Sequence, residues 1–141
     1  MAQKFHARQA YFSVEDSTSA SRAFHPDGGT ITWDESGTNP EVTAFGDPGI
    51  QRAASGFWDL KVTFDGFGDW SANAPIVVME SLKSQPTVIV FGPGGSTSGC
   101  PKFSACVLAT DWSVNSQVKD FVKFKASFEL RTGSPTYGTF P

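Results

Sequence analysis

Residues 58–65 read Trp-Asp-Leu-Lys-Val-Thr-Phe-Asp, and this stretch decides the class of fold. Its even positions are apolar, and its odd positions are charged or hydroxyl-bearing. A side-chain period of two is typical of a β-strand with one buried and one solvated face. The segment therefore predicts a strand that packs one side on a core.

Similar patterns occur on both sides of this stretch. Residues 10–15, 30–33, 87–91 and 103–112 favour strands, and apolar residues at even positions between Val118 and Leu130 predict a closing strand of about a dozen residues. Pro75 introduces Ile76, Met79 and Leu82 at helical spacing, which predicts one short helix. The chain is therefore expected to be mainly β, a β-sandwich or barrel with one flanking α-helix.

The segments between these elements are rich in turn residues. Residues 92–99 (Gly-Pro-Gly-Gly-Ser-Thr-Ser-Gly) predict a hairpin tip, and residues 132–141 predict an extended C-terminal arm. Residues 34–56 show no sustained alternation and predict a long inter-strand loop. Loops above roughly 12–15 residues are uncommon in compact domains unless they are functional.

The composition fits one soluble domain, residues 1–141, with 39% hydrophobic and 18% charged residues. The net charge of −3 provides no basic field for binding nucleic acid. The longest apolar run, residues 76–79, is too short to cross a membrane, and the N-terminus lacks the apolar stretch of a secretory signal. We therefore expect synthesis in a cytoplasm and free thiols at Cys100 and Cys106.

Candidate chemistry is sparse. His6 and His25 have no evident catalytic partner, and Cys100 and Cys106 lack the nearby histidines of a zinc site. Asp59 and Asp65 are six residues apart, roughly 20 Å along a strand, which is too far for paired carboxylate catalysis. We expect no enzymatic activity, no cofactor and no metal. The aromatic residues are expected mainly in the core: Trp58, Phe64, Phe67, Trp70, Phe124 and Phe128.

Several segments, in order, resemble the major tail tube proteins of long-tailed bacteriophages (siphophages). They are Val14-Glu15-Asp16, residues 41–47 (Glu-Val-Thr-Ala-Phe-Gly-Asp), Phe64-Asp65-Gly66-Phe67, the helix, Val90-Phe91-Gly92-Pro93, Phe124-Lys125-Ala126-Ser127-Phe128 and Gly133-Ser134-Pro135. The resemblance covers nearly the whole chain. It implies a β-sandwich or barrel with a flanking helix, a fold shared with type VI secretion tube proteins.

The resemblance also implies a function. Such proteins form rings, usually hexameric, that stack into a virion tail tube through which DNA passes without specific binding. The implied partners are the chain itself and the tape-measure and tail terminator proteins, with synthesis in the host bacterial cytoplasm and no membrane. Candidate lumen residues are Asp59, Lys61 and Asp65, with the polar positions of residues 123–131 as a second set. Candidate subunit-interface residues lie in the long loop: Val42, Thr43, Ala44, Phe45, Gly46, Asp47, Pro48, Ile50 and Arg52.

Two alternatives remain open from the sequence. One is a monomeric carbohydrate-binding β-sandwich that presents Trp58, Trp70 or Trp112 as a platform. The other is a different virion part, such as a neck, terminator or minor tail protein. Acrylamide quenching separates the first alternative from a tube subunit, because a tube subunit is expected to bury Trp58.

Overall fold

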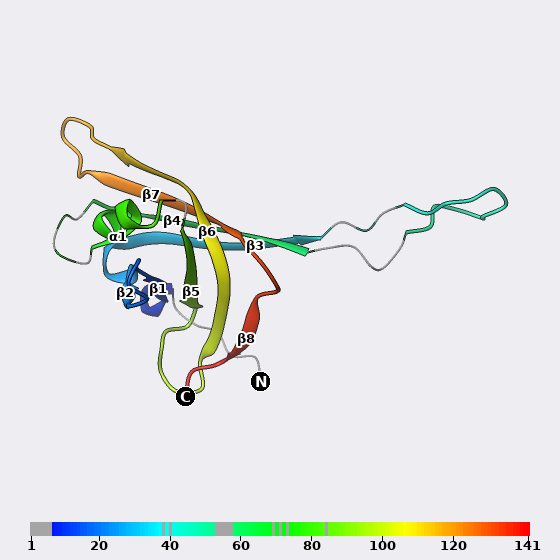
Figure 1. The fold of residues 1–141 in the computed structure, drawn as a ribbon, viewed down its shortest axis with the longest axis horizontal. Helices are drawn as coiled ribbons and strands as arrows, with labels where there is room; N and C mark the ends of the chain where they lie inside the picture. Colours follow the sequence, from blue (N-terminus) through cyan, green and yellow to red (C-terminus); the bar gives the residue numbers. More distant parts are fainter. Residues whose placement is uncertain are drawn as a thin grey trace.

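The computed structural model describes residues 7–37, 39, 41–52, 58–68, 70, 72, 74–83 and 85–141. Within these residues, eight strands accompany one short α-helix (Figure 1). The strands are β1 (Tyr11–Glu15), β2 (Ser21–Ala23), β3 (Gly28–Gly37), β4 (Trp58–Phe67), β5 (Pro86–Gly92), β6 (Pro101–Asn115), β7 (Lys123–Leu130) and β8 (Thr136–Thr139). The helix is α1 (Pro75–Ser81), and 3-10 turns cover Ala7–Gln9 and His25–Asp27. The mainly β prediction is confirmed.

The eight strands form one antiparallel sheet that folds over on itself. Its order is β2-β1-β5-β6-β7-β4-β3, with β8 paired to β6. The 15-residue strand β6 joins the two halves, because its first part pairs with β5 and β8 and its later part pairs with β7. A bulge between Ala109 and Asp111 lies at the change, and bulges bend strands and increase their twist.

Aromatic contacts across the two halves form the core. The ring of Phe12 in β1 lies 5.6 Å from that of Phe64 in β4 and 6.3 Å from that of Phe128 in β7. Because β1 and β4 are not neighbours in the sheet, these contacts show that the halves face each other as two layers. The sandwich prediction is therefore confirmed. Strands β2-β1-β5-β6-β8 form the first layer, and strands β6-β7-β4-β3 form the second layer.

The predicted helix is also present. Pro75 occupies its first turn, and Ile76, Met79 and Leu82 are buried in the core. Its neighbour Lys83 places its ammonium 5.9 Å from the Trp112 ring centroid on β6. The helix therefore covers one flank of the sandwich. No helix in the described part of the chain is long and apolar enough to span a membrane.

Several details differ from the sequence predictions. The strand predicted at residues 30–33 continues to Gly37, so the loop begins later than expected. The last long strand begins only at Lys123, and Val118 lies in the preceding loop with its side chain 91% exposed. The C-terminal segment is not a free arm, because Thr136–Thr139 pairs with β6 as β8.

Three of the aromatic residues expected in the core are exposed: Trp58, Phe67 and Trp70. Trp58 and Phe67 occupy the two ends of β4, and Trp70 lies beyond its C-terminal end. Phe64, Phe124 and Phe128 are buried as predicted. The alternation in β4 is real, but the opposite layer covers only its middle.

Candidate functional site

The second layer has a predominantly polar outer face, with Phe67 at the end of β4 and Leu108 on β6 as apolar members. Along β4 the buried residues Leu60, Val62 and Phe64 point into the core, so the alternate positions point outward. The same alternation runs through β3, β7 and the later part of β6. We call this surface the polar face, and its main members are Thr30, Thr32, Asp34, Ser36, Asp59, Lys61, Thr63, Asp65, Asp111, Ser113, Lys123, Lys125, Ser127 and Glu129.

Strand register arranges the charges of the polar face in rows of mixed sign. Lys61 lies between Asp34 on β3 and Glu129 on β7, and Asp65 lies opposite Lys125. Opposite charges at directly paired positions favour the observed register. Five acids and three lysines belong to the face, so it carries a formal charge of −2 and no basic stripe. Such a surface is hydrated and does not gather phosphates.

Both borders of this layer are unpaired edges among the described residues. Strand β3 pairs only with β4, which leaves its other edge without a backbone partner. Strand β6 loses its β5 partner after Leu108, while β7 continues to pair with it as far as Asn115. Unpaired strand edges are templates for pairing with another chain.

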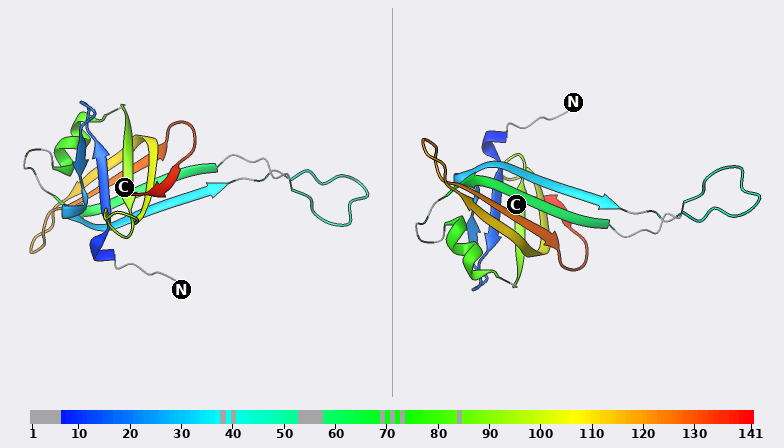
Figure 2. Two further views of the ribbon diagram at one scale, coloured as in Figure 1. Left: turned by 90° about the horizontal axis from the view of Figure 1, so that it is seen from below. Right: turned by 90° about the horizontal axis from the view of Figure 1, so that it is seen from above.

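A long excursion joins β3 to β4. We call residues 41–52 the arm, and Figures 1 and 2 show it projecting far beyond the sandwich along the long axis of the molecule. Its two sides are paired by an antiparallel backbone β-bridge between Glu41 and Arg52 and by a 2.9 Å hydrogen bond from the Val42 N–H to the Gln51 carbonyl. At its tip the Ala44 N–H donates to Asp47 Oδ2 over 2.7 Å. The arm is thus a local hairpin whose side chains are all exposed.

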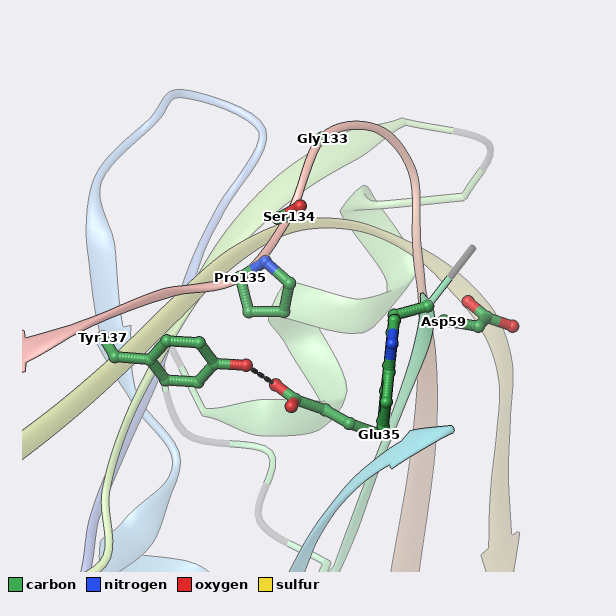
Figure 3. A pocket seen from close by; sticks show the side chains of 7 residues that line it. Glu35, Asp59, Gly133, Ser134, Pro135 and Tyr137 are labelled. Carbon is green, nitrogen blue, oxygen red and sulfur yellow. Dashed lines mark hydrogen bonds between the residues drawn. The ribbon is translucent and has the colours of Figure 1, made fainter. Parts of the chain in front are cut away.

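A cavity of about 400 Å³ lies where β3 ends and β4 begins, beside the segment that leads into β8 (Figure 3). Its lining comprises Glu35, Trp58, Asp59, Gly133, Ser134, Pro135 and Tyr137. The Tyr137 hydroxyl donates to Glu35 Oε1, which also accepts the Trp33 indole N–H over 3.0 Å. The hydrogen bond to this carboxylate raises the pKa of Tyr137 to about 12. The β8 segment is thereby fastened to β3.

This cavity does not bring two carboxylates together for catalysis. Glu35 is the register partner of Leu60, whereas Asp59 pairs with Ser36, so their side chains belong to opposite faces of the sheet. Figure 3 shows Asp59 directed away from Glu35. The arrangement lacks the facing acid pair that glycoside hydrolysis uses.

The remaining reactive groups are structural. The sequence predicted that His25 has no partner, and this prediction is wrong. Its Nδ1 lies 3.3 Å from the Phe12 carbonyl oxygen, and its ring centroid lies 4.9 Å from that of Tyr11. His6 lies outside the described residues. Cys100 and Cys106 are unpaired. Within the described ranges no three His, Cys, Asp or Glu residues cluster as metal ligands would.

The structure groups the residues singled out from the sequence into two places. Asp59, Lys61 and Asp65 share the polar face, and Val42, Thr43, Ala44, Phe45, Gly46, Asp47, Pro48, Ile50 and Arg52 all lie in the arm. Their roles in a lumen and an interface stay predictions. Sequence reasoning missed the contributions of β3 and of the later part of β6 to the polar face. The alternation at Thr30, Thr32 and Asp34 carried that signal.

No protein-family model and no curated protein sequence matches this chain. Solved structures do. The tail of an empty gene transfer agent particle, refined with C6 symmetry, aligns with a TM-score of 0.76 at 8% identity, covering 98% of this chain and 100% of that one. The virion of a native gene transfer agent particle gives 0.71 at 9% identity, covering 98% and 100%. The SPP1 tail tube gives 0.74 at 8% identity, covering 96% and 80%. The predicted tail-tube fold is therefore confirmed.

Proposed function

We propose that this chain is a structural virion subunit that forms hexameric rings, which stack into a tail tube for DNA passage. The observation that carries the proposal is the four-strand layer β6-β7-β4-β3, which has a polar outer face between two unpaired edges. Edge-to-edge pairing of β3 with β6 of the next copy removes both edges and turns the polar faces toward one another. A ring achieves this for every copy.

The C6 symmetry of the similar gene transfer agent tail suggests the number of copies. Six copies of a four-strand layer give about 24 strands. With strands about 4.8 Å apart and tilted by about 40°, the backbone channel is roughly 50 Å across. Its wall carries hydroxyls and mixed charges, so DNA slides past without a stretch of phosphate-binding lysines.

The surroundings of the subunit follow from this assignment. Its principal partner is another copy of itself, and a tape-measure protein inside the tube and a terminator protein at its end complete a tail. The site of action is the virion tail, after synthesis in the bacterial host. We assign no enzymatic role, because the described residues provide no nucleophile, base and orienting group in one place.

The carbohydrate-binding alternative has one observation in its favour, the exposure of Trp58 and Trp70. The two indoles lie near opposite ends of β4 and therefore do not form one stacking platform. Because both indoles are exposed, acrylamide quenching no longer separates the two functions. We therefore rely on assembly and on the response of tryptophan fluorescence to sugars.

Electron microscopy of the purified protein over a concentration series tests the proposal. The expected result is rings with a central hole that stack at higher concentration. Under the same conditions, addition of a soluble oligosaccharide panel should leave tryptophan fluorescence unchanged. Persistent monomers together with saturable quenching by a sugar would replace the tube assignment with the binding module.

A further inference from the structure

The cavity between the β3–β4 ribbon and the β8 segment is lined by aromatic and acidic side chains. Two rings, Trp58 and Tyr137, and two carboxylates, Glu35 and Asp59, bound a space of about 400 Å³. Among the described residues that line it, none is a lysine or an arginine. Aromatic faces attract cations, and carboxylates repel anions. The lining therefore suits a positively charged ligand.

Trp58 offers this cavity an open aromatic face. A Cβ added at Gly37, its register partner, would lie 2.5 Å from Trp58 Cε2 and 2.7 Å from Trp58 Cδ2. These two atoms are shared by both rings of the indole, so the Gly37 backbone lies against one face of the ring. Trp58 is nevertheless 65% exposed, which leaves the other face open. Among aromatic side chains, Trp binds a cation on its face most strongly.

Glu35 is held in position to accept a further hydrogen bond. The Tyr137 hydroxyl and the Trp33 indole N–H both donate to Glu35 Oε1, the indole over 3.0 Å (Figure 3). Within the described part of the chain, Glu35 Oε2 receives no such donor. A carboxylate with one oxygen anchored and the other free presents a fixed acceptor to an N–H of a bound cation.

Asp59 adds negative charge to the cavity without facing Glu35. Its Oδ1 accepts the Leu60 N–H over 2.8 Å, and its side chain is directed away from Glu35 (Figure 3). The basic residues adjacent in sequence, Lys61 and Arg131, do not belong to the lining. The two carboxylates therefore make the potential at the cavity negative.

We infer that this cavity binds a guanidinium group, the head of an arginine side chain. A guanidinium is planar, so it can stack on the open face of Trp58 while its edge donates to Glu35 Oε2. An ammonium offers no plane for stacking. Pro135 and Tyr137 provide apolar surface for the aliphatic stem. The site belongs to the single subunit and does not depend on tube formation.

Nuclear magnetic resonance of the unassembled subunit tests the site with N-acetyl-arginine amide as the probe. The indole N–H signals of Trp33 and Trp58 should shift saturably, and that of Trp70 should not. N-acetyl-citrulline amide, which carries a neutral urea in place of the guanidinium, should bind at least about tenfold more weakly, because the charge-assisted contact is lost. Equal affinities for the two probes overturn the cation site. N-acetyl-lysine amide should also bind more weakly than the arginine probe, and equal or tighter binding overturns the guanidinium assignment.

Two variants separate the stacking contact from the carboxylate contact. Trp58→Leu should weaken binding of the arginine probe about threefold, the usual size of an exposed cation–π contact. Glu35→Gln should reduce the difference in affinity between the arginine and citrulline probes, which a merely structural role of Glu35 would not do. Trp70→Leu replaces a comparably exposed indole outside the cavity and is the matched control. Unchanged binding in both cavity variants overturns the site.

Assembly distinguishes the sources of the guanidinium. If a second copy provides the arginine, both Glu35→Gln and added N-acetyl-arginine amide should raise the concentration at which the subunit assembles, and the citrulline probe should not. If the group comes from another molecule, the probe still binds and assembly is unchanged. Failure of the wild-type protein to form rings overturns the proposed tube function, whereas the probe titration on single subunits still decides the cavity.

Discussion

The Asp16 carboxylate organises the turn that connects β1 to β2. Its Oδ1 accepts hydrogen bonds from the Thr18 hydroxyl at 2.6 Å, the Thr18 N–H at 2.9 Å and the Ala20 N–H at 3.1 Å. Its Oδ2 accepts the Arg22 Nε–H at 2.8 Å. The Thr18 hydroxyl first, and then Arg22, hold the pKa of the Asp16 carboxyl well below its ordinary value of 3.8. Each donor favours the ionised form.

This lowered pKa predicts an acid-dependent contribution to stability. A depressed folded-state pKa stabilises the protein above the ordinary pKa, and the contribution is lost as pH falls toward the folded-state value. Wild type should therefore unfold at a higher temperature than Asp16→Asn near neutral pH. The difference should shrink between about pH 4 and about pH 2. Thermal unfolding followed by circular dichroism measures it, and a pH-independent difference would contradict the assignment.

Tyr137 predicts a dependence at the opposite end of the pH scale. Because its hydroxyl donates to the Glu35 carboxylate, the pKa of Tyr137 rises to about 12. A raised folded-state pKa stabilises the protein below the ordinary value of 10.0, and this stability is lost as pH rises through about 12. The bond is solvent-exposed, so Tyr137→Phe should cost less than about 1 kcal/mol. Ultraviolet titration should show the late ionisation, and Glu35→Gln should return it toward the ordinary value.

Phe64 predicts the largest effect of a single side chain. It is fully buried, and its ring contacts those of Phe12, Phe24 and Phe124. Phe64→Ala should lower the free energy of unfolding by about 3–5 kcal/mol, because it removes apolar burial and leaves a cavity. Phe121→Ala, at an exposed ring, is the matched control and should remain within about 0.5 kcal/mol of wild type. Urea unfolding of the monomer distinguishes the two.

At the scale of elements, the arm is separable from the sandwich. Gly37 and Trp58 are register partners at the base of the β3–β4 ribbon, so a tight turn can join them directly. Replacing residues 38–57 with Asn-Gly supplies a two-residue hairpin of the favoured type. None of residues 41–52 is buried, so the unfolding free energy should change by less than about 1 kcal/mol. Because the arm is a predicted subunit interface, this variant should fold but assemble less than wild type in microscopy, and loss of folding would show that the arm is structural.

The strands and the helix also show how much of the fold the sequence alone predicts. Alternation predicted β4 correctly, and apolar residues at helical spacing after Pro75 predicted α1 correctly, because both patterns are local. It misplaced Trp58, because alternation does not reveal where the facing layer ends. Val118 has an even number, like the buried residues of β7, but this agreement is a coincidence of position, because Val118 lies in the loop before the strand begins at Lys123. The pairing of β8 depends on distant contacts, including Tyr137 with Glu35, which have no local signature.

At the scale of the whole molecule, the two layers expose different surfaces. The first layer and α1 bury one face of the second layer, so the polar face on its other side is not covered by the rest of the subunit. In the proposed tube the unpaired edges of that layer would make the lateral contacts, and the arm, which projects along the long axis, is predicted to contact other subunits. The chain thus offers two separate candidate contact surfaces, and substitutions in one should leave the other unaffected.

Thiol labelling at position 61 tests which surface of the subunit lines the proposed tube. In a Cys100→Ser, Cys106→Ser background, a thiol at Lys61→Cys on the polar face should react with a small maleimide in both monomer and tube. Its reaction with a polymer-linked maleimide wider than the channel should fall roughly tenfold on assembly, because only the tube ends admit the reagent. Glu80→Cys, on the exposed side of α1, is the control and should react with both reagents in either state. Mass spectrometry gives the labelled fraction. Protection of Glu80→Cys together with free labelling of Lys61→Cys would contradict this orientation. It would place α1 on the channel side and the polar face on the outer wall of the tube.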